Sequence, residues 1–173
     1  MTGAGDNARG RIDSWPSGHL GWVFSGGPRF ESAATTFLAE GAARGERRMF
    51  LADNPVVEQW PKHLVDRGEL VIASVTEIYG PDRMVVAASQ RETFATALVE
   101  ALAEGYTGIR VAADNSSLVD TPERLQAWLA WEEVADHFMA ENPVTGLCAF
   151  DRARVGSTTL SDVMGTHHVS MSD

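Results

Sequence analysis

The sequence predicts an α/β protein: a three-layer sandwich around a mostly parallel sheet of about five strands. Two observations carry this prediction. Short apolar segments alternate with helical patterns along most of the chain. In addition, residues 18–53 read as strand, glycine turn, amphipathic helix and strand. That order is a βαβ unit, which joins parallel strands through a right-handed crossover.

The first strand is predicted at residues 20–24, which are apolar and end at the turn sequence Ser25-Gly26-Gly27-Pro28. Residues 30–41 place apolar side chains at three- and four-residue spacing, which is typical of one helix face. The remaining strands are predicted at residues 48–52, 69–73, 109–113 and 144–150. Asn54-Pro55 indicates the start of a short helix, but Pro61 interrupts it, so this helix either begins at Pro61 or kinks there. Further helices are predicted at 91–104, at 121–141 and at 154–164, whereas residues 75–89 fit either helix or strand.

The best-signalled helix begins at Thr121-Pro122-Glu123, because Thr is a good N-cap and Pro suits the first helical position. We expect one folded domain over residues 18–165. Residues 1–17 are rich in Gly, Ser and Asp and are expected to form a flexible tail, and residues 166–173 a loose end.

Composition excludes several classes of function. The 173 residues carry a net charge of −10, which argues against binding nucleic acid or an anionic membrane surface. No apolar run approaches the roughly 20 residues of a membrane span. The N-terminus lacks a hydrophobic export segment, so we expect a cytoplasmic protein. A single cysteine, Cys148, excludes an internal disulfide and a zinc cluster built from several cysteines.

The glycine turn stands where a P-loop would stand, but it lacks the lysine and the following Ser or Thr that bind phosphate and magnesium. The backbone amides of Ser25, Gly26 and Gly27 could still bind an anion at the helix N-terminus, with Arg29 supplying charge. The alternative is a tight connection that needs small residues, with Glu31 in the first turn balancing the helix dipole.

The carboxyl ends of the predicted strands form a second candidate site, because ligands of open parallel sheets bind there. The residues expected at that edge include Asp53, Asp114, Asn115 and Asp151. Acids in this position could hold magnesium or ligand hydroxyls. They could equally form turns or cap helices.

Glu132 shares a helix face with Leu125, Trp128 and Leu129, so its carboxylate needs a partner or a raised pKa. It could bind a ligand or His19, or it could lie at the rim with a solvated carboxylate or form an ordinary buried pair.

Trp22, Trp128 and Trp131 could wall an apolar ligand cavity or be plain core. The sequence suggests a structural role for His19 and Cys148. It does not favour a metal site at His167-His168, since adjacent side chains rarely face the same way.

Several phrases resemble the MEDS domain, the sensory domain named after the regulator DcmR. They include HLGWVF at residues 19–24, FLAEG at 37–41 and ARGER at 43–47. YTGIRVAAD at residues 106–114, the Trp131-Glu132 pair and LCAFD at 147–151 complete the pattern. The helix and second strand also look like those of RecA/KaiC-type ATPases, and the missing lysine fits a degenerate member of that architecture.

This resemblance implies a non-enzymatic input domain that senses a small organic ligand, names no cofactor, and acts in signal transduction or transcription regulation. Actinobacterial relatives are often joined to STAS or other signalling modules. We therefore expect a fused module or a separate regulatory partner of the STAS or sigma-factor-control type. A homodimer is plausible. The alternative is a RecA/KaiC-like protein that binds nucleotide with little or no hydrolysis.

Overall fold

The computed structural model describes residues 15–167 and 169–172, which form one six-stranded, entirely parallel sheet in the order β3-β2-β4-β5-β1-β6. The strands are β1 (His19–Phe24), β2 (Arg47–Ala52), β3 (Leu70–Ser74), β4 (Ile109–Asp114), β5 (Val144–Asp151) and β6 (Val169–Ser172). The predicted α/β class and parallel sheet are confirmed. The prediction of about five strands misses β6, which pairs with β1 at the sheet edge.

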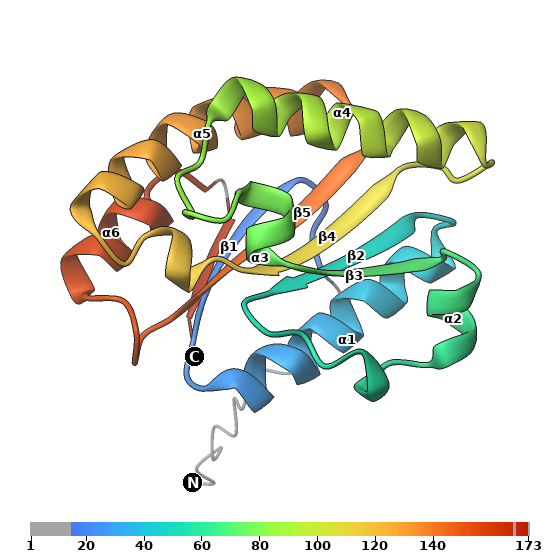
Figure 1. Cartoon of the computed structure of the whole chain (residues 1–173), viewed down its shortest axis with the longest axis horizontal. Helices are drawn as coiled ribbons and strands as arrows, with labels where there is room; N and C mark the ends of the chain where they lie inside the picture. The colour runs from blue at the N-terminus through green and yellow to red at the C-terminus, as the bar shows by residue number, and fades with distance from the viewer. Residues whose placement is uncertain (1–14, 168, 173) are drawn as a thin grey trace, which may run out of the picture.

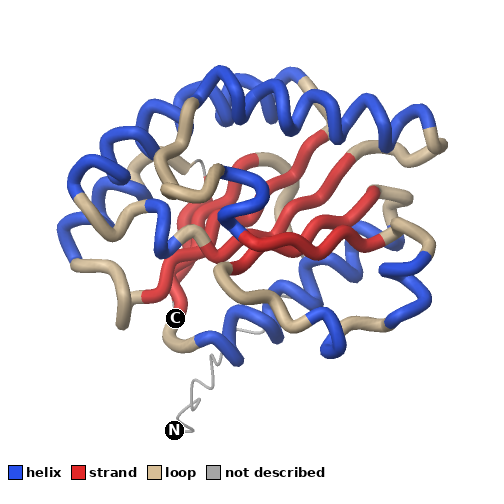
Figure 2. The backbone as a smooth tube through the Cα atoms, viewed as in Figure 1, coloured by secondary structure: helices blue, strands red, loops and turns tan. Residues whose placement is uncertain are grey.

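Helices cover both faces of the sheet, so the molecule has three layers (Figures 1 and 2). One face is covered by α1 (Gly27–Ala43) and α2 (Lys62–Asp66). The other face carries α3 (Val75–Tyr79), α4 (Ala87–Ala103), α5 (Pro122–Glu141) and α6 (Ser157–Met164). None of the helices in the described residues is long and apolar enough to cross a bilayer.

Strand β1 separates the two faces by simple alternation, because successive side chains of a strand point to opposite sides. Leu20, Trp22 and Phe24 pack in the core under α1. His19 lies on the opposite side, where its ring contacts carboxylates of α5. The ring of His167 lies against Gly21 on that same side. The α1 side is therefore apolar, whereas the α5 side of β1 carries polar groups into the core.

The structure decides between the alternatives that the short segments left open. Residues after Asn54 form only a 3-10 turn at Val57–Gln59, and the helix begins directly after Pro61, as one of the two alternatives predicts. Residues 75–79 are helical because Ser74 and Glu77 form a reciprocal capping box.

Both predicted tails contain ordered residues next to the domain. Trp15 is buried, and its backbone N–H donates to the Glu40 carboxylate at 3.0 Å. Its ring packs edge-on against Phe37. At the other end, Thr166 bonds to Glu132, His167 is buried and β6 joins the sheet, so the expectation of a loose end is wrong for these residues. The rest of the predicted N-terminal tail, residues 1–14, lies outside the described residues.

Candidate functional site

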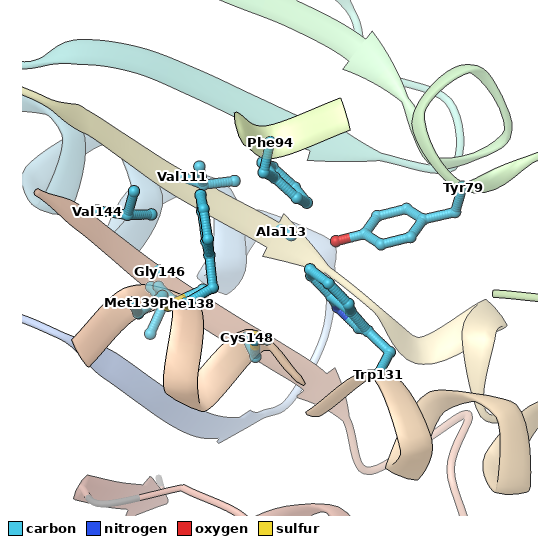
Figure 3. Close-up of a pocket in the computed structure, with 12 residues that line it drawn as sticks. Tyr79, Phe94, Val111, Ala113, Trp131, Phe138, Met139, Val144, Gly146 and Cys148 are labelled. Atoms are coloured by element: carbon cyan, nitrogen blue, oxygen red, sulfur yellow. The ribbon is translucent and has the colours of Figure 1, made fainter. Parts of the chain in front are cut away.

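An apolar pocket lies between the sheet and the helices above it. Its walls come from α3, α4, α5, β4 and β5. The rings of Tyr79, Phe94 and Trp131 converge over Ala113 of β4, and Cys148 stands on β5 at its floor (Figure 3). Almost all of the lining is carbon, so the pocket suits an apolar group, with the Tyr79 hydroxyl as a polar contact.

The pocket is small as it stands. Its cavity volume is about 20 Å³, which is room for about one water molecule. One wall of the pocket can move. The Met139 side chain packs directly on Gly146, and its end methyl would lie 2.8 Å from a Cβ added to that glycine. Methionine side chains change conformation easily, so movement of Met139 would enlarge the pocket.

Trp131 lines this pocket as the sequence predicts, but the other tryptophans do not. Trp22 faces the α1 side of the sheet, where it packs against Phe24. Trp128 is fully buried against Phe150 and does not line the pocket.

Directly behind Cys148 lies a buried polar cluster formed by His19, Glu132, Cys148 and His167. Glu132 Oε2 lies 3.5 Å from His19 Nε2 and 3.2 Å from His167 Nε2. His19 Nε2 also lies 3.7 Å from the sulfur of Cys148. The hydroxyl of Thr166 donates to Glu132 Oε2 at 2.7 Å.

Burial dominates the electrostatics of this cluster. It raises the pKa of Glu132 to about 8, although the Thr166 hydrogen bond acts in the opposite direction. Burial also raises the pKa of the Cys148 thiol well above its usual value, and the nearby Glu132 adds to the effect. Both groups are therefore held in the neutral form unless a cation balances them.

The sequence identified only part of this cluster. Glu132 lies beside His19, which was one of the alternatives that the sequence left open. Cys148 was expected to be a small buried hydrophobe, and His167 fell in the predicted loose end. His168, the other half of the adjacent pair, lies outside the described residues. One available signal was Gly21, since a glycine inside a strand often marks close approach of another group. Here that group is the His167 ring, whose Cγ would lie 2.7 Å from a Cβ on Gly21.

The strand-end acids form a separate group at the carboxyl edge of the sheet. Arg154 donates to Asp53 at 2.6 Å and to Asp114 at 3.2 Å, and Ser117 donates to Asp53 at 2.5 Å. Burial opposes ionisation of Asp53, but Ser117 and Arg154 outweigh it and lower its pKa. At Asp114 burial prevails and raises the pKa. An arginine thus lies between two carboxylates that were expected to face a ligand or magnesium.

The glycine turn is short and partly occupied by the protein itself. Helix α1 begins at Gly27, with Gly26 as a left-handed cap at φ 83°, while Ser25 and Arg29 are exposed. The Gly26 N–H donates to Asp151 at 3.4 Å, which uses one amide expected for an anion. The first turn holds no acidic residue, so the expectation that Glu31 balances the helix dipole there is wrong.

Asn115 stands apart from the other edge residues. Its side chain is fully buried and interacts with the Cys148 thiol, where its hydrogen bond acts to lower the pKa of that thiol against the larger effect of burial. The predicted ligand residues thus fall in two places. Asp53, Asp114, Asn115, Asp151 and the turn lie at the carboxyl edge, whereas Trp131 and Glu132 face the pocket and the cluster.

Comparison with known proteins identifies the family. Residues 18–168 match the profile described as "MEDS: MEthanogen/methylotroph, DcmR Sensory domain". The chain belongs to the MEDS family. This match covers most of the chain, confirms the resemblance found in the sequence, and suggests a sensory role. A comparison with curated proteins found no match.

Among solved structures, the MEDS chain is similar to the flagellar accessory protein FlaH from Methanocaldococcus jannaschii. The TM-score is 0.52 at 10% sequence identity, and the alignment covers 91% of this chain and 71% of FlaH. At this identity the likeness concerns the fold alone. It confirms the predicted RecA/KaiC-like architecture.

Proposed function

We propose that this MEDS domain is a non-enzymatic sensor that binds a small apolar organic molecule in the pocket between α3–α5 and strands β4 and β5. The observation that carries the proposal is the pocket itself, an almost wholly apolar space with one tyrosine hydroxyl in a chain of a sensory family. We assign no catalytic step. The raised pKa of Cys148 makes this thiol a poor nucleophile.

The size of the pocket limits the ligand. Displacing Met139 makes room for only a few heavy atoms, and the best very small ligands gain at most about 1.5 kcal/mol per heavy atom. A ligand of about four heavy atoms would therefore gain at most about 6 kcal/mol, which corresponds to a Kd of roughly tens of micromolar. Screening should accordingly use millimolar concentrations.

The signal would leave through the helices that form the pocket roof. A ligand shifts a conformational equilibrium only if it binds one state better than the other. Met139 and Trp131 both lie on α5, so a ligand that contacts both side chains could transmit its binding to this helix if it favours one position of α5. The neighbouring α4 exposes Val99 and Leu102, which would suit a regulatory partner, a fused module of the STAS type or a second copy. A cytoplasmic place and a part in transcription regulation remain predictions.

The test is a thermal-shift screen of the whole chain against small haloalkanes, alcohols and ketones, with ATP and GTP in parallel. A ligand at a hundred times its Kd stabilises by about 2.7 kcal/mol. For a domain of this size that is a rise in Tm of roughly 5–10 °C.

The matched variants are Ala135→Leu, which fills the pocket, and Ala140→Leu, which adds the same atoms at an exposed position of the same helix. We expect the organic ligand to lose its effect with Ala135→Leu and to keep it with Ala140→Leu. The proposal is wrong if no organic compound raises the Tm, or if Ala135→Leu responds like the unchanged chain.

Nucleotide binding is the weaker candidate. The glycine turn lacks the P-loop lysine, and Arg154 lies between Asp53 and Asp114 at the strand ends. A rise in Tm with ATP that Gly27→Val abolishes would favour it.

A further inference from the structure

Four buried side chains with metal-binding atoms meet behind the floor of the pocket. They come from four different parts of the fold: His19 from β1, Glu132 from α5, Cys148 from β5, and His167 from the connection between α6 and β6. Each is less than 9% exposed, and one donor atom from each lies within 4.8 Å of all the others.

The spacing is close to that of a tetrahedral metal centre. Zinc binds nitrogen and oxygen at about 2.0–2.2 Å and sulfur at about 2.3 Å, so ligand atoms stand roughly 3.3–3.7 Å apart. Of the six separations between the four ligand atoms, three are 3.2 Å for His167–Glu132, 3.5 Å for His19–Glu132 and 3.7 Å for His19–Cys148. The widest pair, at no more than 4.8 Å, would have to close by about 1 Å.

Hydrogen bonds at the Nδ1 atom of each imidazole, on the side away from the cluster, orient both rings as metal ligands. Nδ1 of His167 lies 2.8 Å from the carbonyl oxygen of Val163, which can only accept, so this nitrogen carries the proton. Nδ1 of His19 lies 3.4 Å from a carboxylate oxygen of Asp136, which also accepts. In neutral His167 the lone pair therefore sits on Nε2, and His19 takes the same form when its Nδ1 proton is donated to Asp136. Both Nε2 atoms face Glu132. Metal-binding histidines usually have such outer partners.

With both imidazoles in that form and Glu132 ionised, the cluster brings only acceptors together. Two imidazole lone pairs and a carboxylate oxygen then converge within 3.2 and 3.5 Å, in a place shielded from water. Glu132 Oε1, also buried, has no hydrogen-bond partner among the described residues. Such groups are costly to bury unless a proton or a cation lies between them.

We propose that His19, Glu132, Cys148 and His167 form a binding site for one divalent transition-metal ion, with Zn²⁺ as its occupant. Two imidazoles, a thiolate and a carboxylate are ligands that zinc accepts. The two negative charges of Cys148 and Glu132 balance the charge of the ion. Binding would release the Cys148 thiol proton, and the Glu132 proton where it is present.

The site would have a structural consequence at the sheet edge. Strand β6 is short and, within the described residues, pairs with β1 alone, and His167 lies two positions before it. The ion would tie the segment to α5, β1 and β5. It would also place a metal-bound sulfur at the floor of the pocket, since Cys148 belongs to both. The metal proposal does not depend on the organic ligand.

The alternative is a hydrogen-bonded cluster that shares protons and binds no metal. To separate the two, the untagged chain is refolded with reductant and Co²⁺, which serves as a coloured substitute for zinc. We expect one Co²⁺ per chain, with the visible bands of a tetrahedral centre and a near-ultraviolet thiolate-to-cobalt band. Zn²⁺ should displace the colour, and zinc should be retained after dialysis.

Variants assign the ligands. Cys148→Ser should abolish the thiolate band, and His167→Gln should lower affinity. Asp136→Asn, which alters only the outer partner of His19, should weaken binding about 10- to 100-fold. His137→Gln is the matched control, because this exposed histidine lies on the same helix outside the cluster. The proposal is overturned if the folded, unchanged chain retains no zinc and gives no thiolate band with Co²⁺. It is also overturned if Cys148→Ser keeps that band.

Discussion

Replacing Gly21 with alanine would test how tightly His167 is packed against β1. A Cβ at this position would lie 2.7 Å from Cγ, 2.9 Å from Nδ1 and 3.1 Å from Cβ of His167. These atoms belong to a ring held on one side by the Val163 carbonyl and on the other by Glu132. The ring cannot simply rotate away, so the new methyl group must displace His167 and the start of β6.

The size of the effect follows from two opposing contributions. Adding a methylene-sized group to a well-packed core costs about 1–3 kcal/mol. Alanine in a strand, however, is more favourable than glycine by about 0.5–1 kcal/mol, because glycine loses more backbone freedom on folding. We therefore expect Gly21→Ala to lower the free energy of unfolding by about 1–2 kcal/mol.

Gly146→Ala is the matched control, since Gly146 lies in the neighbouring strand and faces the pocket. Its new Cβ would meet Met139 Cε at 2.8 Å, the far end of a flexible side chain that can move. We expect a change within about 1 kcal/mol, because the gain in strand propensity offsets the rearrangement. Urea unfolding gives both values, provided the slope m is unchanged.

A double-mutant cycle isolates the contact. In a His167→Ala background the obstacle is gone, so Gly21→Ala should become neutral or stabilising, with a coupling energy of about 1–3 kcal/mol between the two positions. The argument fails if Gly21→Ala alone is as stable as the unchanged chain, or if its cost is the same with and without the His167 ring.

Two further predictions concern the buried charges. Arg110 is fully buried and bonds to Glu46 at 2.6 Å, so Arg110→Ala should lower the free energy of unfolding by about 3 kcal/mol or more, measured by urea unfolding. A loss below 1 kcal/mol would contradict this. Arg154→Gln removes a partly exposed partner of Asp53 and Asp114 and should cost about 1 kcal/mol at neutral pH. Because the pKa of Asp53 is lowered in the folded chain, that stabilisation is present above its ordinary value of 3.8 and lost as the pH falls below it. Unfolding curves of the two proteins should therefore converge in acid, and a gap that widens there would refute the reasoning.

The elements with strong local patterns were predictable. Strands β1, β2, β4 and β5 are apolar runs bounded by turns, and α5 has its Thr121 cap. Strand β6 was not predictable, because Val169–Ser172 has only four residues, two of them polar, and forms a strand by pairing with β1. The sequence left open whether the helix near Asn54 begins at Pro61 or kinks there, and the structure shows that it begins after Pro61 while the segment before it is only a 3-10 turn.

By itself the sequence determined the α/β class, the family, the degenerate turn and the set of acids at the strand ends, because each depends on local patterns or on the topology of parallel sheets. Only the tertiary structure decided that Arg154 lies between Asp53 and Asp114, and that Trp131 lines a pocket while Trp22 does not. It also decided that His19 and His167, 148 positions apart in the numbering, meet at Glu132. The physical reason is that contacts between distant segments depend on how helices pack on the sheet. This packing cannot be predicted from the local periodicity of the sequence.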